Sequence, residues 1–358
     1  MTARRSITAS RPATLATVAR AVGVSRMTVS NAYNRPDQLS PALRERILAT
    51  AAELGYAGPH PVARTLSLGT TGNLGLVINY RLTAALTDPA TVQFVHGVAA
   101  GCEEHGLGLT LVPVIPGRDA ALVDGALVDG FVLYGMAGED PRIDAVRRRG
   151  HPHVFVDHAP EPGKRVVNVD DRGASRRLAE HLLALGHRRF GVVLGYGKTS
   201  RTAREAETEA AHHAEIERLA GWRDALEGAG VDWGAVPVGS APGSAGEFQR
   251  VGRDAGAKLL DRADRPTAIL VHFDMLAVGV LEAAADRGIA VPSELSVVGF
   301  DDVPQAATAI PPLTTARQPH MGKGAAAVRL LLDAGEPDTV LLPADLVVRA
   351  STGPVPIS

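Results

Sequence analysis

Two short helices joined by a tight turn, near the start of the chain, restrict the possible folds more than any other feature. Apolar residues recur at helical spacing over Leu15–Val22, and Gly23 follows where a helix can end with a positive φ. Ser25 is a favourable N-cap for a second helix, which we predict to run through Tyr33. This pattern is typical of a helix-turn-helix, in which the second helix enters the major groove of DNA.

A third helix should complete a small helical domain. We predict that it begins at Ser40, with Pro41 in its first turn, and ends at Gly55. Ala19 is small where the first two helices must cross, and Val29 can pack against it. The apolar stripe of the third helix is expected to close the core and consists of Ile47, Leu48, Ala51 and Leu54.

Charge is distributed unevenly along the chain. The whole sequence has 37 basic and 39 acidic side chains and a formal net charge of -2. Residues 1–69 contain nine Arg and three acidic residues, a net charge of +6, which leaves -8 for the remainder. A basic N-terminal part on an acidic body is the pattern expected when only that part contacts phosphate.

Length and composition indicate a globular protein of several domains. The 358 residues are enough for two or three domains, and 45% of them are hydrophobic. The single cysteine, Cys102, excludes an internal disulfide framework and suits a reducing cytoplasm. Neither a membrane-spanning apolar run nor a secretory signal is apparent, so we expect a cytoplasmic protein with no membrane partner.

The N-terminal motifs resemble those of a known family. The ordered pattern LxxVAxxxGVSxxTVSxxxN, followed by SPxxRxRI, ELGY and VARTL, resembles the LacI/GalR family of transcriptional regulators. The resemblance implies a repressor that binds a palindromic operator in double-stranded DNA. Its implied DNA-contacting residues are Thr17, Ser25, Arg26, Met27, Thr28, Ser30, Asn31, Asn34, Arg64 and Leu66.

The same resemblance implies a hinge after the helical domain. In the family the segment that matches Val62–Leu66 folds only on DNA, and its leucine, here Leu66, wedges into the minor groove. The chain departs from the family between Tyr56 and Leu66, where it has ten steps instead of the usual nine. The expected organisation is a basic disordered arm at 1–13, the helix-turn-helix domain at 14–58, the hinge at 59–69 and an effector-binding core at 70–358.

From Gly72 onward, short apolar runs alternate with helical stretches, which favours parallel sheets with helices on both faces. Strands are predicted at 74–78, 107–114, 130–134, 153–156, 190–194, 268–272 and 295–300, and helices at 92–105, 174–185, 216–228 and 275–287. We also expect the run 202–214 to extend a surface helix. The predicted fold class is therefore α/β, with an all-α helix-turn-helix head and a core of doubly wound parallel sheets.

Motifs in the core also resemble the LacI/GalR family, whose core is similar to periplasmic sugar-binding proteins. They are NVDDRGASRRLAEHLLALGHRRFGVV, ERLAGWRDAL, PTAILVHFDMLAVGVLEAA and VPSELSVVGFDDVP. The resemblance implies two subdomains, at about 72–168 with 319–342 and at about 169–318 with 343–358. The implied chain crossings between them lie near Asn168, Gln318 and Pro343.

Such a core places its ligand beyond the carboxyl ends of the strands. By resemblance, residues that match Arg218 and Asp301 bind the effector, and those that match Asp157 and Phe273 line the pocket. A carboxylate and a planar guanidinium suit the neighbouring hydroxyls of a sugar, so we favour a saccharide over a nucleobase compound. The predicted effector site consists of Asn79, Tyr80, Tyr134, Asp157, Arg218, Phe273 and Asp301. Two further acids, Asp274 and Asp302, are expected to be helix or turn caps rather than ligands.

One alternative stays open, a solute-binding or sugar-modifying protein that shares only the core. The basic helix-turn-helix argues against it, and no nucleophile–base pair stands out, so we do not expect an enzyme. We expect no cofactor and no metal, because the histidines lack metal-ligand spacing. The C-terminal PVPIS lacks an apolar heptad tail, so we expect a homodimer rather than a tetramer. Whether the ligand weakens or strengthens DNA binding stays open.

Overall fold

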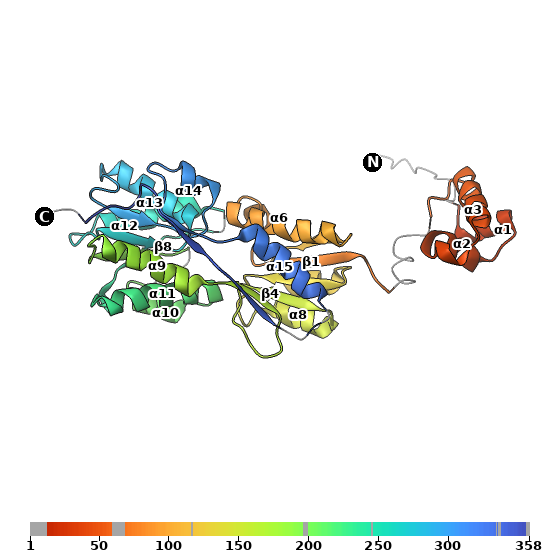
Figure 1. Ribbon diagram of the computed structural model, residues 1–358, viewed down its shortest axis with the longest axis horizontal. Coiled ribbons are helices and arrows are strands. Elements are labelled where there is room, and N and C mark those ends of the chain that lie inside the picture. Colours follow the sequence, from red (N-terminus) through yellow and green to blue (C-terminus); the bar gives the residue numbers. More distant parts are fainter. Residues whose placement is uncertain are drawn as a thin grey trace, which may run out of the picture. The chain divides into compact units, whose positions relative to one another are not determined.

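The computed structural model describes residues 13–58, 69–115, 117–195, 200–244, 246–333, 335 and 338–355 (Figure 1). The chain divides into two compact units, which we call the head (Met1–Thr71) and the core (Gly72–Ser358). The predicted arm and hinge, including Arg64 and Leu66, lie almost entirely outside the described residues.

Within its described residues, the head contains three α-helices and one short 3-10 turn. Its elements are α1 (Leu15–Val22), α2 (Arg26–Asn34), η1 (Pro36–Gln38) and α3 (Pro41–Glu53). Gly23 ends α1 with a φ of 77°, and the side chain of Ser25 accepts a hydrogen bond from the backbone N–H of Thr28 at the start of α2. The helices enclose a small core, which consists of Val18, Ala19, Val29, Ala32, Ile47 and Ala51.

The predicted helix-turn-helix is confirmed, with one difference in α3. Val29 packs with Ala19 in the core, as expected from the small side chain at the helix crossing. Leu54, which we predicted to belong to the apolar stripe of the third helix, is 40% exposed. That prediction is wrong because α3 ends at Glu53 and Leu54 is its C-cap, beyond the last turn that faces the core.

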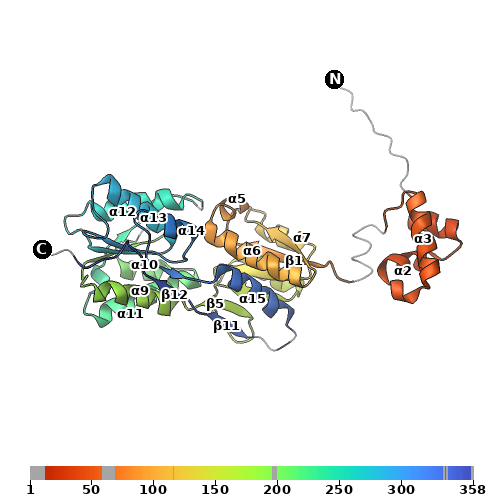
Figure 2. The same cartoon turned by 45° about the horizontal axis from the view of Figure 1, so that its top comes forward.

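Within the described residues, six parallel strands form the first sheet of the core, in the order β11-β5-β4-β3-β1-β2. We call this half lobe 1. One face is covered by the packed pair α6 (Pro89–Glu104) and α15 (His320–Leu332), which Figures 1 and 2 both show side by side. The other face packs against α7 (Asp119–Gly125) and α8 (Pro141–Arg149). Its strands are β1 (Asn73–Ile78), β2 (Gly108–Val112), β3 (Gly130–Tyr134), β4 (His153–Val156), β5 (Val166–Val169) and β11 (Thr339–Leu342).

A second, smaller parallel sheet forms lobe 2, in the order β7-β6-β8-β9. Helices α9 (Asp171–Ala184) and α11 (His213–Gly228) pack on one face, and α12 (Phe248–Leu260) and α13 (Asp274–Asp286) on the other. The strands are β6 (Phe190–Val193), β7 (Val238–Gly239), β8 (Ala268–Val271) and β9 (Ser296–Val298). Smaller elements are α5 (Leu82–Ala85) in lobe 1, and α10 (Ala203–Glu209), η2 (Trp233–Ala235) and α14 (Pro304–Thr308) in lobe 2.

Three connections join the lobes: after β5, between β10 and α15, and after β11. Strands β10 (Thr315–Arg317) and β12 (Asp345–Val347) pair antiparallel beside them. Lobe 1 is therefore completed by a late segment of the chain, because α15 and β11 follow most of lobe 2 in sequence, and only β12 and the residues after it return to lobe 2 (Figure 2).

The predicted α/β class is confirmed, and the strands predicted at Gly130–Tyr134 and His153–Val156 match β3 and β4 residue for residue. The prediction of one extended helix over 202–214 is wrong. Ala210 has an extended backbone, with φ -68° and ψ 129°, so α10 ends at Glu209 and α11 begins separately at His213. No helix in the described part of the chain is long and apolar enough to cross a membrane.

Candidate ligand cavity and nucleic-acid interface

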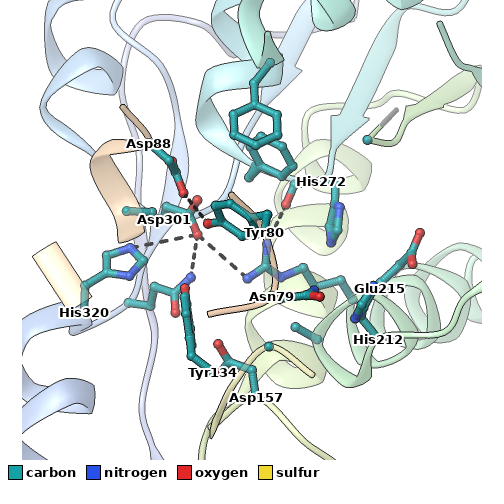
Figure 3. Close-up of a pocket in the computed structure, with 18 of the residues that line it drawn as sticks. Asn79, Tyr80, Asp88, Tyr134, Asp157, His212, Glu215, His272, Asp301 and His320 are labelled. Carbon is teal, nitrogen blue, oxygen red and sulfur yellow. Dashed lines mark hydrogen bonds and ion pairs between the residues drawn. The ribbon is translucent and has the colours of Figure 1, made fainter. Parts of the chain in front are cut away.

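A cavity of about 470 Å³ lies between the two lobes, where strands of both sheets end (Figure 3). From lobe 1, β1 leads to Asn79 and Tyr80, and β4 leads to Asp157. From lobe 2, β8 leads to Phe273, and β9 is followed by Asp301. Parallel strands bring their carboxyl ends to one edge of a sheet, which is why residues distant in sequence converge here.

The structure brings all seven predicted effector residues to this one cavity. Asn79, Tyr80, Tyr134, Asp157, Arg218, Phe273 and Asp301 all line it. Their role in binding stays a prediction, but their convergence is the geometry that a binding site requires.

A buried charge cluster lies at the lobe 2 side of the cavity. Arg218, on α11, donates from Nε to Asp171 Oδ1 at 2.8 Å and from a terminal nitrogen to the carbonyl oxygen of His272 at 2.6 Å. Its other terminal nitrogen lies 3.8 Å from Asp301 Oδ1. The guanidinium also lies over the ring of Phe300, 3.7 Å from its centroid. Arg218 is therefore fixed in place by several partners at once.

Burial changes the protonation of this cluster. It raises the pKa of Asp301 to about 7, although the neighbouring Arg218 opposes the shift. Burial also raises the pKa of Asp171, again against the effect of Arg218. Acids whose charged form is disfavoured and that face a cavity are common at functional sites.

A second set of contacts joins the two lobes along the cavity. Lys323, on α15 of lobe 1, donates to Asp157 Oδ2 at 2.7 Å and to Gln318 Oε1 at 2.9 Å. The amide nitrogen of Gln318 donates to Asp301 Oδ1 in lobe 2. Gln318 thus links the charged groups of lobe 1 to those of lobe 2.

Backbone strain coincides with the cavity. Among the described residues, the non-glycine residues with positive φ are Asp157 (57°), Asp301 (118°) and Asp302 (57°), and the first two line the cavity. Such conformations are costly and tend to cluster at ligand clamps and active sites.

Aromatic rings form apolar parts of the wall. Tyr134 stacks on Phe94 with 4.1 Å between ring centroids, and Phe273 contacts Phe248 edge-on at 4.9 Å. The hydroxyl of Tyr80 donates to Asp88 Oδ2 at 3.2 Å. Rings beside carboxylates suit a ligand that has both an apolar face and hydroxyl groups.

Sequence reasoning missed several residues of the cavity. These are Asp88, Glu209, His212, Glu215, Gln318, His320 and Lys323. Glu209, His212 and Glu215 lie at or next to the break between α10 and α11. We had predicted one continuous helix there, so these residues were not expected at the cavity. A signal existed for the last two, because His320 and Lys323 are polar residues one turn apart in a helix that is otherwise apolar apart from Arg329.

Two acids that we predicted to be structural have internal partners. Asp274 Oδ1 accepts from the hydroxyl of Thr315 at 2.6 Å, and its Oδ2 accepts from the backbone N–H of Val303 at 3.0 Å. Asp302 accepts from Arg317 and Arg349, each at 2.6 Å. Both carboxylates therefore hold loops of lobe 2 and neither lines the cavity, but these contacts are not the helix or turn caps that we predicted.

In the head, α2 presents an accessible face of mixed polarity. Met27 is 69% exposed, Arg26 is exposed, and Ser30 is half-buried. Arginine suits the acceptor edge of guanine, and an exposed apolar side chain suits the methyl group of thymine. The exposed apolar residue on α2 is therefore consistent with contact to base edges in the major groove.

Other predicted DNA-contacting residues also hold the helix ends. Thr17 lies in the first turn of α1, and Ser25 caps α2 through Thr28 at 3.0 Å. The amide of Asn31 donates to Gln38 at 3.2 Å, and that of Asn34 donates to Ser30 at 3.2 Å. These side chains are thus held in place at the surface of α2 and its neighbours.

Comparison with known families finds matches to two separate parts of the chain. Residues 14–58 match the model of bacterial regulatory proteins of the lacI family. Residues 179–352 match a periplasmic binding protein-like domain.

Individual relatives resemble nearly the whole chain. An HTH-type transcriptional regulator of Mycobacterium tuberculosis is 41% identical and covers 98% of this chain and 99% of its own length. The Lac repressor dimer bound to operator and the anti-inducer ONPF is 27% identical, with a TM-score of 0.76 over 96% of this chain and 100% of its own. A CelR–cellobiose complex is 29% identical, with a TM-score of 0.69 over 95% of this chain and 99% of its own.

Proposed function

The chain belongs to the LacI family of bacterial transcriptional regulators, and from this premise we propose that it is a repressor whose affinity for DNA is set by a small ligand in the interlobe cavity. The observation that carries the proposal is the pairing of two sites in one chain. A basic head exposes Arg26 and Met27 on α2, and a core contains a polar cavity that both lobes line.

The DNA partner in this proposal is a palindromic operator bound by a homodimer. A structural relative, the Lac repressor, is bound as a dimer to its operator. Two copies of one head, related by a twofold axis, read two half-sites of opposite orientation. Nine arginines against three acids in residues 1–69 supply the attraction to phosphate.

The hinge is part of the proposal, although its residues lie outside the described ones. Val62–Leu66 is too short to be a stable helix in water by itself, so it must gain its order from DNA and from the partner subunit. A change in the angle between the lobes alters the distance between two hinges in a dimer, and this couples the ligand to DNA.

The ligand in this proposal is a saccharide. A cavity of about 470 Å³ lies in the usual range for small-molecule sites. Its carboxylates, guanidinium and rings match hydroxyl groups and the apolar face of a sugar ring. The structural relative CelR is in complex with cellobiose, which supports the same class of ligand here.

The cavity binds its ligand without transforming it, and the protein acts in the cytoplasm. Asp157 and Asp301, which could serve as acid or base, are held by Lys323 and by Gln318 with Arg218 nearby. A bacterial regulator of transcription meets its DNA in the cytoplasm, which is the basis for that location.

The proposal is tested by selecting binding sites from a random DNA pool with the full-length protein. We expect enrichment of a palindromic sequence whose binding weakens steeply with salt. The Arg26→Ala variant should lose discrimination at one base position of each half-site. Enrichment of no sequence, or binding unaffected by deletion of residues 1–69, would refute the proposal and favour a solute-binding protein.

A further inference from the structure

Polar groups of the cavity fall into two sets, those that already have partners and those that do not. Arg218 and Gln318 belong to the first set, because each has its own partners within the protein. Asp157 Oδ1 and both ring nitrogens of His320 are buried and have no hydrogen-bond partner among the described residues. A buried polar group without a partner is costly, and a native protein retains it where a ligand or water completes it.

His320 begins α15 and is only 2% exposed, although it lines the cavity. Its Nε2 lies 4.0 Å from Asp301 Oδ1, too far for a hydrogen bond, and Figure 3 shows the two side chains directed towards each other. Burial lowers the pKa of His320 to about 3, and nearby Lys323 and Arg218 act in the same direction. A neutral imidazole offers one donor and one acceptor, which a single charged group cannot satisfy together.

Lys323 lies one turn further along α15 and is 1% exposed. Two acceptors, Asp157 Oδ2 and Gln318 Oε1, take two of its three N–H groups. Its ammonium also lies 5.5 Å from the ring centroid of Tyr134. The charge of Lys323 is therefore already balanced by Asp157, while one N–H remains for an acceptor oxygen.

The charge of the whole wall restricts the ligand further. Five acidic side chains among the described residues line the cavity: Asp88, Asp157, Glu209, Glu215 and Asp301. Burial raises the pKa of Asp301 to about 7, so the other four supply most of the negative charge. The permanent cations among the described residues that line it are Arg218 and Lys323, and both lie next to acids in ion pairs. Among the described residues of this wall, no unbalanced cation is present to receive a phosphate group, so charge repulsion opposes its binding.

We propose that His320 and Lys323, together with Asp157 Oδ1, form the specificity-determining subsite of the cavity and select an uncharged ligand with adjacent hydroxyl groups over its phosphorylated form. The inference deepens the proposed function and rests on the cavity being the effector site. Each hydroxyl donates one hydrogen bond and accepts others, so it can donate to Asp157 and accept from Lys323 or His320. The contribution of α15 is new, because both residues lie outside the site that the sequence predicted.

The experiment measures ligand binding to full-length protein without DNA, by thermal shift and by calorimetry. The probes are a panel of uncharged monosaccharides, disaccharides and sugar alcohols, each paired with its phosphate ester. We expect at least one uncharged member to raise the Tm, and its ester to bind at least tenfold more weakly. Stabilisation by esters alone, by a nucleobase compound alone, or by no uncharged member would overturn the proposal.

Variants then locate the subsite on α15. His320→Phe should lower the affinity for the uncharged ligand roughly tenfold, because two hydrogen bonds from the ring to the ligand are lost. His320→Gln should restore part of this affinity. Lys323→Met should lower the affinity for the ligand by a similar factor. The matched control is Met321→Leu, on the same helix, whose side chain is 45% exposed and does not line the cavity. It should leave ligand binding unchanged.

A second readout separates binding from a merely structural role. The ring nitrogens of His320 have no internal hydrogen bond to lose, so ligand-free His320→Phe should have a Tm no lower than that of the wild type. A lower Tm with unchanged ligand affinity would make His320 a structural residue and overturn the assignment. Operator binding is measured separately. Its absence in the wild type would refute the proposed function, whereas preference for an ester with operator binding intact would refute only this inference.

Discussion

Replacing Arg218 by methionine should destabilise lobe 2 by several kcal/mol. The side chain is 6% exposed and lies between Asp171 and Asp301, which are 3% and 7% exposed. Methionine fills much of the same volume and keeps contact with Phe300, so the substitution removes little packing energy. The main loss is the cation, which leaves two buried carboxylates without their charge partner. Breaking a buried pair in this way costs about 3–5 kcal/mol.

The destabilisation caused by Arg218→Met should depend on pH. Burial raises the pKa of Asp301 to about 7 even with Arg218 present, so without the guanidinium this acid takes up a proton more readily. A protonated Asp301 no longer needs a cation. The destabilisation should therefore be largest above about pH 8 and decrease towards about pH 6.

The assay is urea unfolding followed by tryptophan fluorescence. The two tryptophans of the chain, Trp222 and Trp233, are both fully buried in the core of lobe 2, so the signal reports this lobe. The control is Arg204→Met, because Arg204 and its partner Glu227 are 57% and 45% exposed. That variant should cost no more than about 1 kcal/mol. Equal, small losses in both variants at about pH 8 would refute the reasoning.

Further predictions concern other parts of the molecule. Arg26→Ala should lose about 1–3 kcal/mol on the selected operator and little on random DNA, as measured by fluorescence anisotropy; equal losses on both would make Arg26 a phosphate contact. Leu66→Ala should weaken operator binding by several kcal/mol and reduce DNA bending in a gel assay, whereas an unbent operator in the wild-type complex would contradict the wedge. Asp301 has a folded pKa of about 7, above the unfolded value of about 3.9, so its native state holds a proton that the unfolded state releases. Wild-type stability should therefore fall relative to Asp301→Asn as pH rises from about 5 to about 8, and parallel pH profiles would disprove the shift. Gly279→Ala places a Cβ 2.0 Å from a carbonyl oxygen of α12 and should cost about 1–3 kcal/mol in thermal unfolding, while Gly228→Ala, with open space around its Cβ, should not.

Local patterns predicted the head well because its determinants are close together in sequence. Gly23 and Ser25 mark the turn between α1 and α2, and each acts through neighbours within four residues. Buried strands such as Gly130–Tyr134 are equally visible, since a short apolar run between turn signals admits few alternatives. Other strands were not predicted, including the apolar β5 (Val166–Val169) and β11 (Thr339–Leu342), which pair with each other across a long separation in sequence. The two residues of β7, Val238–Gly239, have no periodicity to read, and they become a strand only because β6 lies beside them.

The cavity was predictable to the extent that strands end in it. Asp157 and Asp301 follow buried strands, so their position could be inferred from the sheet alone. His320 and Lys323 could not be placed in that way, because they reach the cavity from a helix that follows most of lobe 2 in sequence but packs on lobe 1. Only the long-range packing of α15 on α6 decides which face of that helix borders the cavity.

The late position of α15 and β11 has a consequence for synthesis of the protein. On the ribosome the head and the first five strands of lobe 1 emerge before lobe 2, whereas the helix that covers their apolar face emerges near the end. Until then Leu74, Leu76 and Val154 lack the cover that Ala327 and Val328 provide. A nascent chain of this kind exposes apolar surface through most of its translation, which makes it a candidate for chaperone binding. A premature stop before α15 would yield a chain that has a head able to fold but a core without this wall of the cavity, and hence a regulator that no ligand could control.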